Sequence, residues 1–376
     1  MASPSTLVYF NQQVAGHDKL MSMPTSNLII VKPCTKKEVD FYQDAQGYPD
    51  LLDFIAECYG TLRAATEKEL ELLDSTELND SDDIRPFTTH IIINSYSSSQ
   101  NLCLENISHG FTRPCIMDLK MGSLLYDQDA TTEKRNRMIH HSKTTTSGSL
   151  GLRISGMKVY DSIDRRYATY QKAYGKSRTP ENIKEAILAY LFPTSRYGKA
   201  SEEYRIYVDD LSQRQPTTTT TDVDQLEPQQ QEEKQHIIRE KLPTKYTRWI
   251  IECFIDTIKE LRAVIMSHPN LRLIGSSILF IYEGDRTVAE KTWNYMLEED
   301  SKPNKKDKQK GNVAEDEEVE EDETDTPKMC DLRLIDFAHS DWQAEREEQD
   351  PELLKGFSNI IDILEECLKE QKLQNL

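Results

Sequence analysis

The sequence feature that most constrains this chain is the stretch 114–122, which reads Pro-Cys-Ile-Met-Asp-Leu-Lys-Met-Gly. An extended strand points successive side chains to opposite faces, so Asp118 and Lys120 share one face and apolar residues occupy the other. Phosphoryl transfer requires a cation where negative charge develops and an acceptor that orients a hydroxyl nucleophile, and this pair supplies both. An isolated Asp-x-Lys is more often a salt bridge at a strand edge. Pro114 and Gly122, which fix the start of the strand and permit a turn or a close ligand after it, favour the functional interpretation.

Length and charge narrow the classes of protein that fit. The chain has 376 residues and a net charge of -19, which suits a two-lobed enzyme with long inserts and argues against a general nucleic-acid binder. Residues 112–178 nevertheless carry 13 Lys and Arg against 6 Asp and Glu, a local net charge of +7. A basic region around Asp118 and Lys120 suits a small polyanion, although charge alone equally fits a solvated basic surface.

The cysteines and the apolar runs indicate the environment of the protein. The seven cysteines are scattered singly, without a C-x-x-C pair, so we expect reduced and mostly buried thiols rather than a disulfide framework or a zinc site. No apolar run approaches membrane-spanning length, and the N-terminus lacks a signal-peptide pattern. We therefore expect a soluble, intracellular protein without a transmembrane segment.

The N-terminal part is expected to form a small β-rich lobe. The apolar residues 27–31 predict a strand that ends at Lys32, where a lysine can contact phosphate. A helix follows, with Thr35 as N-cap and Glu38 three residues later, the pattern of a capping box. Glu38 has two alternative roles: it caps the helix, which is the commoner role, or it pairs with Lys32 as a kinase helix glutamate does.

Two more buried strands are predicted at 90–93 and 101–104. The second leads into the polar residues 105–108, which suit a hinge between lobes whose backbone can read an adenine edge. A short polar segment without an apolar helical stripe follows Gly122, and a strand with a glycine break follows it at 152–160.

The C-terminal part alternates further helices, strands and polar inserts. We expect a helix with Thr179 as N-cap and Pro180 in its first turn, because proline suits that position. The remaining expectations are helices at 249–267 and 353–373, strands at 275–284 and 332–335, and disordered inserts at 213–235 and 300–327.

Asp336 follows the last strand and precedes Phe337. An aspartate in this position can bind Mg²⁺, although an isolated aspartate after a strand is more often a turn residue. Together with Lys32 and the Asp118–Lys120 pair, Asp336 completes the groups that phosphoryl transfer needs.

The order of these features resembles the inositol polyphosphate kinase family. The chain presents in turn the strand-end lysine, the hinge, P-x-x-x-D-x-K-x-G, Ser-Ser-Ile-Leu at 276–279 and Ile-Asp-Phe at 335–337. Within the family the resemblance is closest to the fungal inositol polyphosphate multikinases, through the stretches 14–17, 40–42, 104–105, 130–134, 156–160 and 335–339.

The resemblance implies an α+β fold with two lobes, the inositol polyphosphate kinase fold that is similar to protein kinases and SAICAR synthetase. It implies a small β-rich N-lobe at 1–107 and a larger α+β C-lobe at 108–376, with an inositol-binding segment at 123–178.

The resemblance also implies a role for each matching residue, with Asp118 and Lys120 as the catalytic pair. The residues implied to contact ATP are Lys32, Glu38, Glu105, Ile107, Asp118 and Asp336. Those implied to contact the inositol phosphate are Lys120, Lys134, Arg137, Lys172 and His339. The implied Mg²⁺ ligands are Asp336 and Ser276.

The implied activity is an ATP- and Mg²⁺-dependent kinase that converts inositol trisphosphate to tetrakis- and pentakisphosphate. The short segment before Arg153 resembles the open site of a multikinase. The alternatives are a hexakisphosphate kinase that forms pyrophosphates and a transcription-regulatory scaffold. The scaffold alternative rests on residues 315–325, nine of which are Asp or Glu, because this segment resembles the acidic tract of fungal multikinases. That resemblance implies basic transcription-factor partners and a location in the nucleus and cytoplasm.

Overall fold

The structure is a computed structural model that describes residues 7–16, 19–23, 26–64, 91–93, 100–209, 241–301, 326–374 and 376. The predicted insert 213–235 and the acidic tract 315–325 lie outside the described residues, as does most of the insert 300–327. Their predicted disorder stays a prediction.

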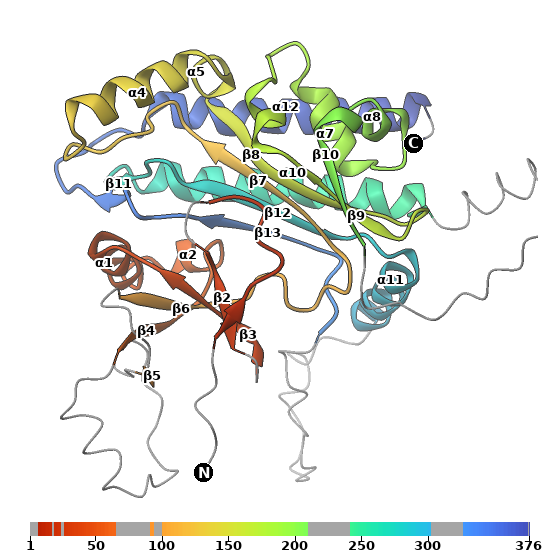
Figure 1. Ribbon diagram of the computed structural model, residues 1–376, viewed down its shortest axis with the longest axis horizontal. Helices are drawn as coiled ribbons and strands as arrows, with labels where there is room; N and C mark the ends of the chain where they lie inside the picture. The colour runs from red at the N-terminus through yellow and green to blue at the C-terminus, as the bar shows by residue number, and fades with distance from the viewer. Residues whose placement is uncertain are drawn as a thin grey trace, which may run out of the picture.

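The described part of the chain forms two six-stranded sheets with helices packed around them, so the predicted α+β class is confirmed. Figure 1 shows the N-terminal sheet below the C-terminal one. The N-terminal sheet has the order β1-β2-β3-β6-β4-β5. Its strands are β1 (Val8–Tyr9), β2 (Met21–Met23), β3 (Ser26–Pro33), β4 (Cys58–Ala64), β5 (Ile91–Ile93) and β6 (Asn101–Glu105).

The element that matters most in the N-terminal part is the step from β3 into α1 (Lys36–Ala45). The predicted strand and helix are both confirmed, and Thr35 is the N-cap, with its hydroxyl accepting from the Glu38 amide at 3.4 Å. Helix α1 buries Val39, Phe41 and other residues of one face against the core. Lys32 and Glu38 are thereby fixed at neighbouring ends of a strand and a helix.

The C-terminal sheet has the order β10-β9-β8-β7-β12-β13, and each described pairing within it is antiparallel. Strand β7 therefore lies in the middle of the sheet, hydrogen-bonded on both sides. The strands are β7 (Pro114–Met121), β8 (Leu152–Asp161), β9 (Arg166–Tyr170), β10 (Arg205–Asp209), β12 (Ser277–Glu283) and β13 (Cys330–Ile335).

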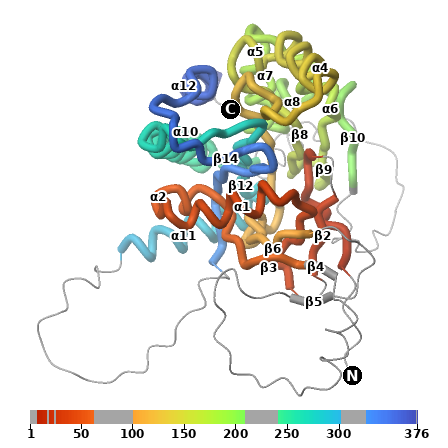
Figure 2. Tube along the Cα trace, turned by 90° about the vertical axis from the view of Figure 1, so that its left-hand side faces the viewer, coloured from red at the N-terminus to blue at the C-terminus, as the bar shows by residue number. Residues whose placement is uncertain are grey.

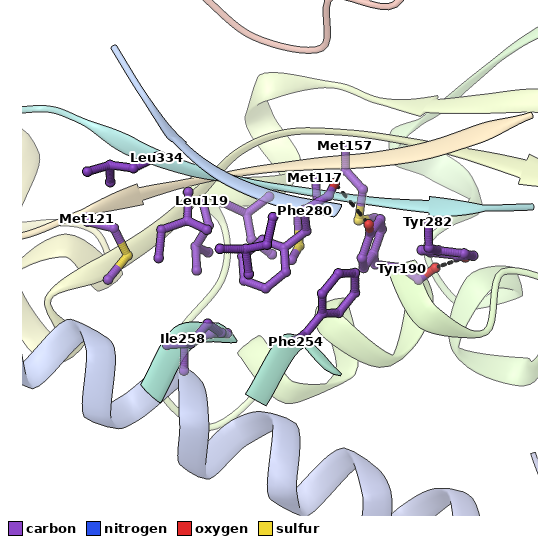
Figure 3. Close-up of a cluster of buried hydrophobic side chains, with 14 of the residues drawn as sticks. Met117, Leu119, Met121, Met157, Tyr190, Phe254, Ile258, Phe280, Tyr282 and Leu334 are labelled. Carbon is purple, nitrogen blue, oxygen red and sulfur yellow. Dashed lines mark hydrogen bonds between the residues drawn. The ribbon is translucent and has the colours of Figure 1, made fainter. Parts of the chain in front are cut away.

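One face of this sheet is covered by α7 (Ile183–Leu191), α10 (Thr244–Ser267) and α12 (Pro351–Gln374), and α10 and α12 lie on the same side in Figure 2. Figure 3 shows Met117 and Leu119 of β7 among buried side chains that include Phe254 and Ile258 of α10. The Tyr282 hydroxyl donates to a carbonyl of α7 at 2.7 Å, so the buried tyrosine is not left without a partner. The helix-covered face is the main core.

The N-terminal part is joined to the last strand of the C-terminal sheet. The Leu334 amide donates to the Phe54 carbonyl at 2.7 Å, and Ile55 forms an isolated parallel bridge with Leu334. The Arg333 guanidinium also donates to the Asp53 carbonyl. These contacts hold the two sheets together directly before Asp336.

One expectation about helices is wrong, and one pair of helices was not predicted. The segment after Gly122 forms α4 (Thr132–Lys143) and α5 (Thr146–Leu150), and Thr131 caps α4. Helix α4 buries only Ser142, so it has no apolar stripe for a periodicity argument to detect. The helix expected from Thr179 begins at Ile183 as α7, because residues 179–182 form a turn in which the Thr179 amide donates to the Asn182 side chain.

The remaining elements are short or peripheral, and no pattern in the sequence predicted them. They are α2 (Pro49–Leu52), α6 (Lys172–Lys176), α8 (Arg196–Lys199), the 3-10 helix η1 (Glu202–Tyr204), β11 (Leu271–Arg272), α11 (Arg286–Ser301) and β14 (Asp341–Trp342). Among the described residues, no helix is long and apolar enough to cross a membrane.

Candidate active site

Asp118 and Lys120 lie on β7, on the sheet face opposite the helix-covered core. Lys120 is the register partner of Ser277 on β12 and of Arg153 on β8. Directly paired residues of an antiparallel sheet point to the same face, so these three side chains form a row across three strands. Asp118 precedes Lys120 by two positions and shares this face. The alternation expected from the sequence is therefore present.

Lys32 connects the N-terminal strand with the loop after β13. Its ammonium lies 2.7 Å from Glu38 Oε1 and 2.7 Å from Asp336 Oδ1. Glu38 Oε1 also accepts from the Phe337 amide at 3.2 Å. Of the two alternatives for Glu38, the contacts favour the pairing with Lys32. The Thr35 side chain caps the helix, and Lys32 donates to the Glu38 carboxylate.

Asp336 is held in a special backbone conformation. Its φ is 68°, in the left-handed region that residues other than glycine rarely adopt. Burial favours the neutral acid, but the charges of Lys32 and Lys120 prevail and hold the pKa of Asp336 below its ordinary value. Asp336 is therefore ionised at neutral pH, as a magnesium ligand must be.

The pKa of Asp118 is shifted in the opposite direction from that of Asp336. Burial and the nearby Asp336 charge raise the pKa of Asp118 to about 6, although Lys120, Ser277 and Arg153 act in the other direction. Its side-chain atom Oδ1 is buried and has no hydrogen-bond partner within the described structure. A buried acceptor without a donor costs free energy, and a hydroxyl of a bound ligand would supply that donor.

The donor set fits a magnesium–nucleotide complex. Asp336 is an ionised carboxylate and Asp118 offers a free oxygen, and both belong to the hard ligands that Mg²⁺ prefers. Within the described ranges, no group of three or more His, Cys, Asp or Glu side chains is assembled for a metal ion. Proteins usually hold Mg²⁺ through one or two carboxylates together with substrate phosphates and water, and Asp118 and Asp336 supply two carboxylates here.

Ser276 stays a predicted magnesium ligand, and its neighbour Ser277 lies closer to the chemistry. Both serines are fully buried. The Ser276 hydroxyl has no hydrogen-bond partner among the described residues, whereas the Ser277 hydroxyl lies close enough to Asp118 to lower its pKa. Ser277 pairs with Lys120 on one side and with Ile335 on the other, so it shares the face of Asp118. Ser277 is the serine that the sheet brings to the catalytic pair.

His339 and Asp127 form a polar pair beside this site. His339 Nδ1 lies 2.8 Å from Asp127 Oδ2, and Lys37 Nζ lies 3.5 Å from the same oxygen. Lys37 also lies 2.5 Å from Asp129. Burial opposes ionisation, but His339, Lys37 and Lys134 together lower the pKa of Asp127. The loop before α4 is thus fastened to α1.

The three basic residues proposed for substrate phosphates are spread over two helices. Lys134, in the first turn of α4, is half-buried and close enough to Asp127 to influence its pKa. Arg137 is exposed on the same helix. Lys172 is exposed at the start of α6, and its ammonium donates to the Gly16 carbonyl at 3.3 Å. The structure therefore gathers Lys134 with the His339 pair, whereas no described contact joins Arg137 or Lys172 to it.

Glu105 and Ile107 occupy the passage between the two sheets. The Glu105 amide donates to the Glu57 carbonyl at 2.8 Å, so this donor is engaged inside the protein. Ile107 is buried beside Ile116 and Ile281, and in the described structure its backbone makes no hydrogen bond. Of the two hinge residues, Ile107 has the backbone groups that a ligand can use.

Sequence reasoning missed Arg153, Ser277, Lys37 and Asp127 as site residues. Arg153 is buried beside Lys120, and its Nε has no hydrogen-bond partner within the described structure. An arginine near the start of the predicted strand 152–160 is itself a signal if that strand is buried, because a buried guanidinium needs an anion. The other three gave no comparable signal, since only the fold brings them to the site.

Comparisons with known proteins address the family directly. A family model described as inositol polyphosphate kinase matches residues 101–226 and 218–365. The inositol polyphosphate multikinase of Saccharomyces cerevisiae is 28% identical over 93% of this chain and 96% of its own length. The Schizosaccharomyces pombe inositol polyphosphate multikinase is 32% identical over 52% of this chain and 67% of its own length.

Similarity extends to an inositol hexakisphosphate kinase and to a solved structure. Mouse inositol hexakisphosphate kinase 1 is 26% identical over 72% of this chain, which matches 52% of that protein's length. The crystal structure of the S. cerevisiae inositol phosphate multikinase Ipk2, solved with ADP and Mn²⁺, superposes with a TM-score of 0.55 at 24% identity and covers 91% of this chain and 100% of that one. This superposition supports the shared two-lobed fold. Because the family model spans most of the chain, including β7, β12 and β13, the chain belongs to the inositol polyphosphate kinase family.

Proposed function

We propose that this protein is an ATP-dependent inositol polyphosphate multikinase, which phosphorylates inositol trisphosphate to tetrakis- and pentakisphosphate. One observation carries the proposal. Asp118 and Lys120 lie on the face of β7 opposite the helix-covered core, next to an ionised Asp336 that forms an ion pair with Lys32. This arrangement places a hydroxyl acceptor, a cation and a metal ligand around one point, as phosphoryl transfer requires.

The nucleotide side of the site is assigned to three charged residues. Lys32, supported by Glu38, would hold ATP phosphates, and Asp336 would bind Mg²⁺. When bound, Mg²⁺ neutralises charge on the phosphate oxygens. The exposed fraction of the Lys32 side chain is 16%, so water competes little for its interactions. The free backbone groups of Ile107 would contact the adenine.

The part of the site that binds the inositol phosphate is assigned to Lys120, Arg153 and their neighbours. Lys120 would contact the transferred phosphoryl group, and the buried Arg153 beside it would bind a phosphate of the inositol. Lys134 and His339 would hold further phosphates. Asp118 would accept a hydrogen bond from the reacting hydroxyl through its free Oδ1. The protein's part in catalysis is thus to position the reactants and to neutralise their charge.

The choice of a multikinase over a hexakisphosphate kinase rests on the extent of similarity. The S. cerevisiae multikinase matches over 96% of its length, whereas mouse hexakisphosphate kinase 1 matches over 52%. Purified protein incubated with labelled ATP, Mg²⁺ and each inositol phosphate in turn separates the two. We expect tetrakis- and pentakisphosphate from trisphosphate; turnover of hexakisphosphate alone, with pyrophosphate products, would replace the proposal with its rival.

We further propose that the protein resides in the nucleus and cytoplasm and binds basic transcription-factor partners through residues 315–325. The support is the density of carboxylates in this tract, nine in eleven residues, which attracts basic surfaces over a distance set by ionic strength. Fluorescence microscopy of the tagged protein tests the location. Pull-down of basic nuclear proteins by the full chain, compared with a chain that lacks 315–325, tests the partners.

A further inference from the structure

A cavity of about 390 Å³ lies behind the last strand of the C-terminal sheet, away from the candidate active site. Its wall combines three parts of the chain: Asp53 and Phe54 from the N-terminal part, Trp249 and Cys253 from the first half of α10, and the start of β13 from Cys330 onward. The cavity therefore sits where the segment after α2, the last strand of the C-terminal sheet and helix α10 meet.

Two of the seven cysteines line this cavity together. The thiols of Cys253 and Cys330 lie within hydrogen-bonding reach of each other. All seven cysteines are within the described residues, and all are free thiols. Cys253, Cys330 and Cys34 are half-buried, whereas the other four are buried. Cys253 and Cys330 thus combine two properties that disulfide chemistry requires, proximity of the two side chains in one cavity wall and partial exposure to solvent.

The two thiols are electrostatically unequal. The hydrogen bond from Cys330 lowers the pKa of Cys253, in spite of burial and of the nearby carboxylates Asp256 and Glu252. The same hydrogen bond, together with burial, raises the pKa of Cys330 well above its ordinary value. Because the thiolate is the reactive form, we assign the first attack to Cys253 and the resolving step to Cys330.

A metal site does not explain the pair. Zinc would require four ligands, and no cluster of three or more His, Cys, Asp or Glu side chains suited to a metal occurs in the described part of the chain. A purely structural role does not require the thiols to be accessible from a cavity. The arrangement is instead that of a nucleophilic and a resolving cysteine.

We propose that Cys253 and Cys330 are a site of reversible oxidative modification, at which a hydroperoxide produces an intramolecular disulfide. The Cys253 thiolate attacks one peroxide oxygen, so that an S–O bond forms, the O–O bond breaks and the alcohol or water leaves with a proton. The Cys330 sulfur then displaces water from the Cys253 sulfenic acid and forms the S–S bond. Two thiols are oxidised and one peroxide is reduced, and a dithiol reverses the change.

The disulfide would join α10 to β13. Cys330 begins the strand that ends at Ile335, immediately before Asp336. Leu334 and Arg333 of the same strand hold residues 53–55 of the N-terminal part. Oxidation would therefore fix the strand that carries the metal ligand to the core helix, and it would constrain the unfolded chain as well.

Peptide mapping of the full-length protein tests the proposal without reference to kinase activity. The reduced protein is treated with a few equivalents of hydrogen peroxide, remaining thiols are blocked, and the digest is analysed by mass spectrometry. We expect a single major cross-linked species that joins the Cys253 and Cys330 peptides, a rise in thermal midpoint of several degrees, and the loss of both changes after dithiothreitol.

Three variants make the result specific. Cys330→Ser should stop the reaction at a Cys253 sulfenic acid that a dimedone probe labels, and Cys253→Ser should abolish both the cross-link and the label. Cys34→Ser, which removes the other half-buried thiol, should leave the cross-link unchanged. Oxidation of wild-type protein that gives only disulfides between chains, or that modifies Cys34 before Cys253, would overturn the proposal.

Discussion

The Lys32 ammonium lies 2.7 Å from the Asp336 carboxylate, although 304 positions separate the two residues in the chain. Glu38 shares the same ammonium at 2.7 Å and also accepts from the amide that follows Asp336. One lysine therefore fixes the end of β3, helix α1 and the loop after β13 relative to one another. The nucleotide part of the site is assembled by this contact.

Replacing Lys32 with Met should leave two carboxylates without their cation. Removing one partner of a buried ion pair is strongly destabilising, and with Asp336 partly exposed we expect a loss of about 2–3 kcal/mol in the free energy of unfolding. The KM for ATP should rise at least about tenfold. Urea denaturation and steady-state kinetics measure these effects, with Lys36→Met, an exposed lysine on α1, as the matched control. Equal behaviour of the two variants would show that the contact carries neither effect.

Asp336→Asn should raise the Mg²⁺ concentration required for half-maximal activity. The amide keeps the shape of the side chain but removes the charge that a hard cation prefers. We expect a shift of at least about tenfold, measured by titrating Mg²⁺ at saturating ATP. A titration curve that matches wild type would make Asp336 a turn residue only.

Asp118→Asn should stabilise the fold while it abolishes turnover. The pKa of Asp118 is raised from 3.8 to about 6, so the folded protein binds this proton more tightly than the unfolded chain. Stability from this group therefore falls as pH rises between those two values, and the loss is about 3 kcal/mol above the higher one. We expect the variant to unfold at a higher urea concentration at neutral pH, with a smaller difference at pH 4.

Asp127→Asn is the control, because it should change the stability in the opposite direction from Asp118→Asn. The pKa of Asp127 is lowered by His339, Lys37 and Lys134, against burial, so its contribution to stability is present at neutral pH and is lost as pH falls. The Asp127 variant should be less stable than wild type at neutral pH by about 1 kcal/mol. If both aspartate variants shift the urea midpoint in the same direction, the electrostatic account of Asp118 is wrong.

Deletion of residues 315–325 should leave kcat unchanged. The tract has a single apolar residue, Val319, and its removal takes away nine negative charges from a protein that binds an anionic substrate. We expect KM for inositol trisphosphate to fall slightly at low salt and to match wild type at higher salt, because salt screens the repulsion. A collapse of kcat would mean that the tract packs on the catalytic body.

Strong local patterns made part of the fold predictable. The strand at β3 and the capped helix α1 follow from an apolar run and from the Thr35–Glu38 spacing, and both are present. The face assignment of Asp118 and Lys120 follows from alternation within β7, which the register with β8 and β12 bears out. These predictions succeeded because each depends on neighbours within a few residues.

The elements that were missed depend on less local physics. Helix α4 carries an exposed, basic surface instead of an apolar stripe. Strand β9 lies beside β10 near the sheet edge, where Arg166 stacks 3.6 Å above the Tyr207 ring and so covers apolar surface with charged side chains. The Cys253–Cys330 contact and the Asp127–His339 pair join distant segments, and a single sequence contains no signal for them.

The central claim is that Lys120 stabilises the phosphoryl group during its transfer to an inositol phosphate. Its most direct test is the single-turnover rate of Lys120→Met with labelled ATP and inositol trisphosphate, compared with wild type and with Lys259→Met, an exposed lysine on α10. We predict a rate at least about 100-fold lower for Lys120→Met, equivalent to about 3 kcal/mol, with ATP binding retained and the Lys259 variant unaffected. A Lys120→Met protein that transfers phosphate at the wild-type rate would contradict the account.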